Sequence, residues 1–237
     1  MKRTFLFLII GSIFLSACRK ETSFVPPEIA ESCQTQTAIP SGRSYNSDSV
    51  VAVNYNKKVC GFLPLSKKNY WIYRDSIFNN GTFLKVQYDT LRYTSTFRSL
   101  SDSLIWWESN ISVGLPLRLY TTETSLFEIE NRFFNPEFID AKKSYSLFEG
   151  DSTRYLSNFE DNAAFGRSVK IKNAINTTAG SFTDCILFEK NALDYRIDQV
   201  YFKPGFGVIK YFMSKSPFGS KEIKLQQVST LVAFHFE

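Results

Sequence analysis

The sequence lacks the residues on which most catalytic and metal sites depend. It has one histidine, His235, no Cys-x-x-Cys pair and no glycine-rich loop ending in Lys-Ser or Lys-Thr. A Ser-His-Asp or Cys-His mechanism would therefore have to use a histidine next to the C-terminus, and zinc needs several close His or Cys ligands. We expect no catalytic residues, no cofactor and no metal. One enzymatic alternative stays open, a hydrolase that uses a pair of carboxylates.

Charged residues are also scarce, and neither sign is in large excess. Only 22% of the 237 residues are charged, and the net charge is +5 without any long basic stretch. This balance excludes a nucleic-acid partner and wholesale disorder. What the chain has instead is aromatic side chains, 23 Phe and 12 Tyr among them, which favours strands over helices.

Beyond the N-terminus, no apolar run is long enough to cross a membrane. The N-terminus has Lys2 and Arg3 followed by a short apolar run over residues 4–14, which is typical of a secretory signal. The next residues, Leu15-Ser16-Ala17-Cys18, resemble the lipobox of bacterial lipoproteins. This resemblance implies cleavage after residue 17 and acylation of Cys18. The alternative is an ordinary signal peptide with an incidental cysteine.

Composition divides the rest of the chain in two. We predict a signal peptide over 1–17, a lipidated N-terminus and flexible tether over 18–48, which is rich in Ser, Thr and Pro, and one domain over 49–237. In an exported protein, Cys33 and Cys60 could form a disulfide that pins the tether to the domain. Three free thiols are an equally weighted alternative.

Strand signals dominate the domain. The segments 70–78 and 82–91 flank Asn80-Gly81, which predicts a hairpin, and Pro204-Gly205 predicts a second turn. Helix is limited to a turn or two near 135–143 or 160–166. Adjacent Trp106 and Trp107 point to opposite faces of a strand, so we expect at most one in the core. We predict an all-β fold with minor helix, a large antiparallel sheet curled into a half-barrel or barrel.

Short pieces of the domain resemble a family. They are the lipobox, the run Asn69-Tyr70-Trp71-Ile72-Tyr73, and the Cys185 strand followed by Pro204-Gly205-Phe206-Gly207-Val208. Together they are similar to lipoproteins of the Bacteroidota type and to the curled antiparallel half-barrel of the LolA/LolB lipoprotein carriers. The resemblance implies architecture, and no functional residue of the carriers is transferred.

Five of the ten aspartates precede Ser or Thr and then an aliphatic residue or Thr. This pattern resembles the O-glycosylation signal on exported proteins of Bacteroidota, and the candidate acceptors are Ser49, Ser76, Thr90, Ser103 and Ser152. The alternative is that Asp-Ser pairs mark strand ends and turns.

We therefore expect a non-catalytic lipoprotein that contacts the membrane through N-terminal acyl chains. It would bind an apolar ligand, such as a lipid, in the concave face of its sheet, or an envelope protein. The alternative is a structural or surface-interaction lipoprotein with no small-molecule ligand. Residues Arg19-Lys20-Glu21 lack a full acidic cluster. We therefore favour the periplasmic side of the outer membrane over the cell surface.

Overall fold

A computed structural model describes residues 33–40, 44–45, 50–100, 102–131, 139–146, 154–159 and 162–237. Every regular element among them is a strand, so the predicted all-β class is confirmed. The strands are β1 (Gln34–Thr35), β2 (Ser44–Tyr45), β3 (Val50–Val53), β4 (Val59–Cys60), β5 (Tyr70–Asn79), β6 (Thr82–Ser99), β7 (Ile105–Ser109), β8 (Arg118–Thr121), β9 (Ser125–Asn131), β10 (Ile139–Ser146), β11 (Arg154–Phe159), β12 (Asn162–Lys170), β13 (Ile175–Thr177), β14 (Gly180–Phe182), β15 (Ile186–Ala192), β16 (Arg196–Lys203), β17 (Gly207–Lys215) and β18 (Lys224–His235). The described chain has no helix that could cross a bilayer.

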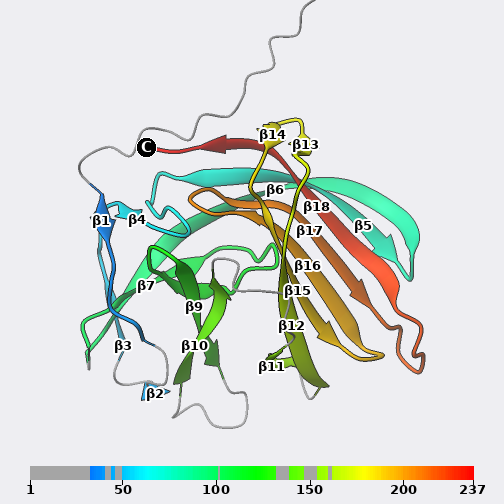
Figure 1. Ribbon diagram of the computed structural model, residues 1–237, viewed down its shortest axis with the longest axis horizontal. Helices are drawn as coiled ribbons and strands as arrows, with labels where there is room; N and C mark the ends of the chain where they lie inside the picture. The colour runs from blue at the N-terminus through cyan, green and yellow to red at the C-terminus, as the bar shows by residue number, and fades with distance from the viewer. Residues whose placement is uncertain are drawn as a thin grey trace, which may run out of the picture.

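Fourteen strands form one sheet in the order β11-β12-β15-β16-β17-β18-β5-β6-β7-β8-β9-β10-β2, and β3 pairs with the far end of β6. Its neighbouring strands run antiparallel. Figure 1 shows the sheet as an arch, in which β5, β6 and β18 form the top and β7 to β10 curl beneath it. The predicted curled half-barrel is present.

The two predicted turns hold β5, β6, β16 and β17 in place. Asn80 and Gly81 both have positive φ, +51° and +86°, and Asn79 pairs with Thr82, as a two-residue hairpin requires. Gly205 has φ +73° in the turn between β16 and β17. The sequence signals for both hairpins are confirmed.

The predicted short helices are wrong where the structure describes them. Residues 139–143 belong to β10 and residues 162–166 belong to β12. The partners of these segments explain the difference, because β10 pairs with β9 and β12 pairs with β15 over most of their lengths. Tertiary pairing outweighs weak local preference in such segments.

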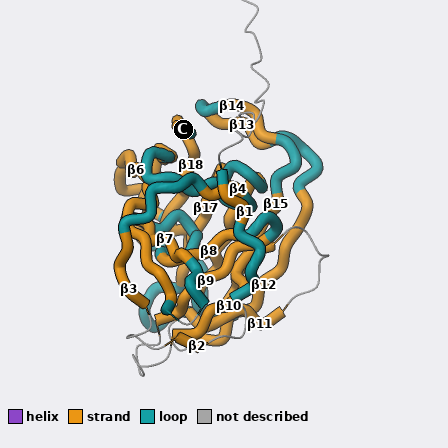
Figure 2. The backbone as a smooth tube through the Cα atoms, turned by 90° about the vertical axis from the view of Figure 1, so that its left-hand side faces the viewer, coloured by secondary structure: helices purple, strands orange, loops and turns teal. Residues whose placement is uncertain are grey.

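The N-terminal part of the described chain is fastened to the domain. Cys33 is joined to Cys60 by a disulfide, and β1 pairs with β4 in parallel through Gln34↔Val59 and Thr35↔Cys60. Figure 2 shows β1 and β4 side by side. Of the tether predicted over 18–48, the part from Cys33 to Thr35 is therefore held by a covalent bond and a strand pairing.

Trp106 and Trp107 point to opposite faces of β7, as alternation requires, yet both are fully buried. Trp107 belongs to the large core on the concave side, whereas Trp106 packs with Tyr120 and Phe127 in a second cluster. The expectation that at most one is in the core is wrong. The reason is that this part of the sheet is covered on both faces.

Candidate functional site

The upper part of the concave face, which would hold an apolar ligand in an open half-barrel, is filled by the chain itself. Residues 59–65 run from β4 into the interior, and residues 111–115 enter it between β7 and β8 (Figure 1). Six of the deeply buried core residues come from these two segments and are Val59, Phe62, Leu63, Leu65, Val113 and Leu115. We call the two segments the inner plug.

Phe62 links opposite walls of the half-barrel. Its backbone NH donates to the carbonyl of Thr122, after β8, at 2.8 Å, and its carbonyl accepts from the NH of Gly205, after β16, at 2.9 Å. Its ring stacks on Phe202 with 4.7 Å between centroids and 13° between planes. The inner plug is therefore bonded to both sides of the sheet and has a defined place in the core.

Gly114 is a position where the inner plug packs tightly against the sheet. A Cβ at this position would lie 2.4 Å from Cγ2 of Val200 and 2.6 Å from a ring carbon of Tyr211. No side chain fits there, because real Cβ contacts are never that short. An acyl chain has no room between residues 111–115 and strands β16 and β17.

Polar groups begin where the inner plug ends. Tyr211, Ser229 and Asp75 stand opposite one another across β17, β18 and β5. Directly opposing residues of neighbouring strands lie close enough to interact. Gln87 follows in the same row on β6, with Asp89 two residues along that strand. We call this row with Asp89 the polar row.

Asp75 is the most deeply buried carboxyl of the polar row, with 2% of its surface exposed. Burial raises its pKa to about 6, aided by the hydrogen bond and charge of Asp89 and opposed by a hydrogen bond with Ser229. Gln87 Nε2 donates to Asp89 Oδ2 at 2.9 Å, and Gln227 Nε2 donates to Ser229 Oγ at 2.9 Å. Asp75 therefore keeps its proton to a higher pH than an exposed aspartate does.

An ion pair contacts the polar row at its other end, where Tyr211 lies. Arg196 binds Asp198 through two hydrogen bonds of 2.8 Å, and its Nη2 donates to the hydroxyl of Tyr211 at 3.3 Å. Burial raises the pKa of Tyr211, so this hydroxyl stays protonated at any physiological pH. The negative charge of Asp198 compensates the positive charge of Arg196, so the partly buried guanidinium can lie next to the core.

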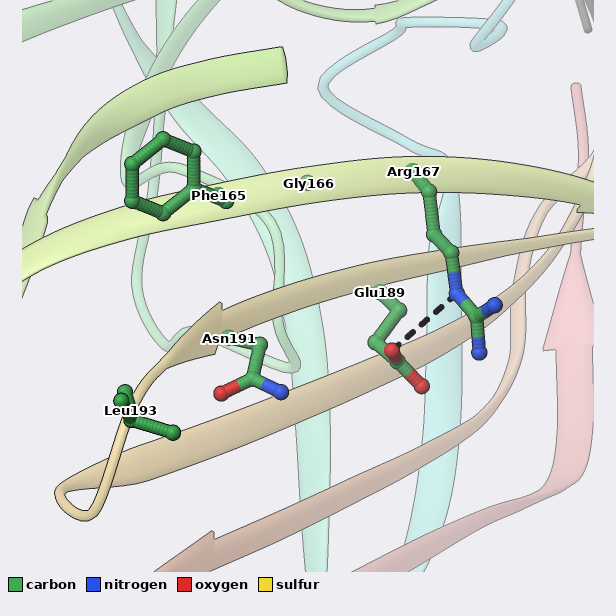
Figure 3. A pocket seen from close by; sticks show the side chains of 6 residues that line it. All are labelled: Phe165, Gly166, Arg167, Glu189, Asn191 and Leu193. Carbon is green, nitrogen blue, oxygen red and sulfur yellow. Dashed lines mark hydrogen bonds and ion pairs between the residues drawn. The ribbon is translucent and has the colours of Figure 1, made fainter. Parts of the chain in front are cut away.

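Two hollows open on the surface of the protein, and the first, which we call the outer hollow, lies on the outer face of β12 and β15. The first is about 370 Å³ and is shown in Figure 3; its lining residues are Phe165, Gly166, Arg167, Glu189, Asn191 and Leu193. Glu189 accepts from Arg167 Nε at 3.2 Å and from Gln199 Nε2 at 2.9 Å. The second hollow is about 450 Å³ and lies between β3 and β6. Both are open to solvent, unlike the packed interior.

The predicted site residues are scattered over the fold. Cys18, Ser49 and Ser152 lie outside the described residues. Ser103 is exposed and has φ +60° in the turn between β6 and β7, where Asp102 Oδ1 accepts from the NH of Leu104 at 3.1 Å. That geometry is an Asp-based turn, as the alternative for these motifs predicts.

Ser76 and Thr90 lie in the middle of β5 and β6, so they do not mark strand ends. Because strand side chains alternate, each is half-buried on the outer face while the preceding Asp75 or Asp89 points inward. The carboxyl pair was thus missed by sequence reasoning, although both members belong to the Asp-Ser/Thr motifs. The signal that could have found Asp75 is its spacing of two from buried Tyr73.

Asp184 and Glu189 are carboxylates that lie just before β15 and within it, and their surroundings differ. Asp184 has φ +56° in the turn before β15, and Glu189 binds Arg167 on the outer face. Among the described residues, no group of three or more His, Cys, Asp or Glu side chains could hold a metal ion.

No family model and no curated protein matches the chain. Among solved structures, it is similar to a crystal structure described as a "putative lipoprotein from Parabacteroides distasonis". The identity is 12% and the TM-score 0.38, over 74% of this chain and 99% of that chain. A likeness this weak carries no argument about activity, so the proposals below rest on the sequence and on the packing.

Proposed function

We propose that the protein is a cell-envelope lipoprotein, anchored by acyl chains on Cys18 at the periplasmic side of the outer membrane. The run Leu15-Ser16-Ala17-Cys18 after a short apolar segment supports this anchor. The disulfide between Cys33 and Cys60 fits an exported protein, because disulfides persist in oxidising compartments. Several acyl chains on one residue give stable attachment.

Within the envelope, the half-barrel acts as a binding module whose partner is a protein. The observation that carries this choice is the inner plug, which bonds both walls of the sheet through Phe62 and packs Gly114 against Tyr211. An apolar ligand would have to displace a packed, hydrogen-bonded core. The outer hollow at Phe165, Arg167 and Leu193 combines aromatic, charged and aliphatic groups, as protein interfaces do.

We propose no reaction for the carboxyl pair. With 2% of Asp75 exposed, this carboxyl is out of reach of a substrate. Its neighbours already use the polar atoms around it, since Gln87 donates to Asp89 and Gln227 donates to Ser229. We propose a structural role for the polar row, which separates the apolar core from solvent at one end.

The anchor is tested by fractionating cells that carry the wild-type chain or Cys18→Ala. We expect wild-type protein in the outer-membrane fraction with an acylated N-terminus at residue 18, and the variant free of the membrane or uncleaved. Cys185→Ala is the matched control, because Cys185 is buried in the core. An unmodified wild-type protein in the soluble fraction would contradict the anchor.

A further inference from the structure

Three turns gather at one end of the sheet. They join β5 to β6 at residues 80–81, β15 to β16 at residues 193–195, and β17 to β18 at residues 216–223. Figure 1 shows them at the end opposite β1 and the C-terminus. We call these turns, together with residues 83–85 at the start of β6 and Lys215 and Lys224, which flank the last turn, the turn rim.

Hydrogen bonds make the turn rim one continuous surface. The NH of Gly81 donates to the carbonyl of Leu225 at 3.1 Å, which ties the first turn to β18. The NH of Ser216 donates to the carbonyl of Tyr195 at 2.8 Å, which ties the third turn to the second. The three turns therefore present their tips together.

Large apolar side chains project from the turn rim into solvent. Phe218 is fully exposed, and Leu193 is 85% exposed. Phe83 and Leu84 follow, with 55% and 58% of their surfaces exposed. Leaving four such side chains in water costs free energy that burial in an apolar phase would recover. Because Phe218 and Leu193 lie on separate turns, and Phe83 and Leu84 lie at the start of β6, the four side chains suit a deformable apolar phase better than a flat protein surface.

Positive charge surrounds these tips. The described charged residues of the turn rim are the lysines Lys85, Lys215, Lys221 and Lys224 and the acids Asp194 and Glu222. Lys224 pairs with Glu222 at 3.2 Å, and Lys221 lies 4.0 Å from Asp194. The excess of two lysines favours an anionic surface. Apolar tips bordered by lysines have the chemistry of groups that enter a bilayer beneath anionic headgroups.

The chain that precedes the described residues is long enough to bring the turn rim to the membrane that would hold Cys18. Residues 19–32 can span at most about 50 Å when extended. Strand β5, which runs from the Tyr70 end to the turn rim, is ten residues and thus about 33 Å long. The anchor therefore does not force the turn rim away from the bilayer.

We propose that the turn rim docks on a bilayer surface of anionic phospholipid by inserting Phe218, Leu193, Phe83 and Leu84. This contact goes beyond the proposed acyl anchor. It lays the half-barrel against the membrane and brings the outer hollow at Phe165 to the membrane surface, because Leu193 belongs to both the turn rim and the hollow. Only the argument on tether length rests on the anchor.

The test uses the chain from residue 19, which keeps every described residue and has no acylation site. Flotation with vesicles of phosphatidylglycerol and phosphatidylethanolamine is compared with flotation with phosphatidylcholine vesicles. We expect binding to the anionic vesicles that weakens with salt, and Leu84→Ser with Phe218→Ser to lower the partition coefficient at least about tenfold. Leu100→Ser is the matched control, because Leu100 is 59% exposed just beyond the opposite end of β6.

A second measurement reports insertion directly. In Phe218→Trp, we expect a blue shift of the added emission on mixing with anionic vesicles and quenching by brominated acyl chains. No flotation of the parent chain with either vesicle, or the same loss in Leu100→Ser, would overturn the proposal. So would an unshifted emission in Phe218→Trp, which would indicate a protein docking surface instead. None of these results bears on acylation of Cys18, so the proposed anchor is tested by a separate experiment.

Discussion

Asp75 on β5 pairs directly with Gln87 on β6, and Gln87 donates to Asp89 at 2.9 Å, at the point where the apolar core of the half-barrel gives way to polar side chains. Burial, together with the nearby Asp89, raises the pKa of Asp75 to about 6. This carboxyl therefore keeps its proton to a higher pH than an exposed aspartate does.

The raised pKa of Asp75 makes stability depend on pH. The folded protein holds the proton of Asp75 up to about pH 6, whereas the unfolded chain releases it near pH 4. The contribution is present in full below pH 4 and is lost as pH rises through about 6. We expect a loss on the order of 2 kcal/mol, measured by urea unfolding from pH 4 to 8.

Asp75→Asn should flatten that pH dependence, because the amide carries no titrating proton and can still donate to Asp89. Asp194→Asn is the control, since Asp194 is exposed in a turn and should leave the difference between pH 4 and 8 unchanged. Equal slopes for wild type and Asp75→Asn would contradict the raised pKa of Asp75.

The packing of the inner plug predicts unequal effects at two glycines of similar conformation. Gly114 has φ +81° with Val200 and Tyr211 in its way, whereas Gly219 has φ +78° with nothing within 4 Å. Alanine at either position costs about 1 kcal/mol of backbone strain. Gly114→Ala should cost about 1–3 kcal/mol more through overpacking. Equal denaturation midpoints for the two variants would mean that residues 111–115 are loosely held.

The disulfide predicts a definite pattern of thiol labelling in the chain from residue 19. The thiol of Cys185 is buried and burial raises its pKa to about 11, so iodoacetamide should leave the native protein unmodified. Denaturation without reductant should expose one thiol, and reduction should expose three. Reduction should also lower the unfolding free energy by about 3 kcal/mol, because the bond spans 27 residues. Three labelled thiols without reductant would contradict the pairing.

Glycosylation of the Asp-Ser/Thr motifs stays a proposal with a direct mass test. Ser103 is exposed, whereas Ser76 and Thr90 are half-buried, so Ser103 should be the most fully occupied of the three. Protein purified from its native membrane should carry sugar-sized increments, and Ser103→Ala should remove one of them. A mass that equals the acylated chain alone would contradict the proposal.

Local chemistry made the hairpins predictable. Asn80-Gly81 needs no distant partner to form its turn, and the alternation from Tyr70 to Phe78 identifies the strand that leads into it. The curled sheet follows from many such strands joined by short turns. Residues 139–143 and 162–166 were harder, because their strand pairing depends on β9 and β15 rather than on their own sequence.

Burial on both faces could not be predicted from the sequence. Trp106 lies on the face of β7 that alternation would leave to solvent, and only the packing of Tyr120 and Phe127 against it makes that face a core. The same limit applies to the inner plug. Nothing local marks Gly114 as the residue that touches Val200, because the two are far apart in the chain.

The interior of the half-barrel is packed with its own side chains, and we propose that its only lipid is the one joined covalently to Cys18. Native mass spectrometry of the protein from its own membrane, beside Cys18→Ala, tests both parts after detergent exchange. We predict the mass of an acylated chain that survives activation for the wild type, and a bare chain for the variant. A lipid-sized mass that dissociates from both forms would contradict the account, since it would require a cavity where residues 59–65 and 111–115 now pack.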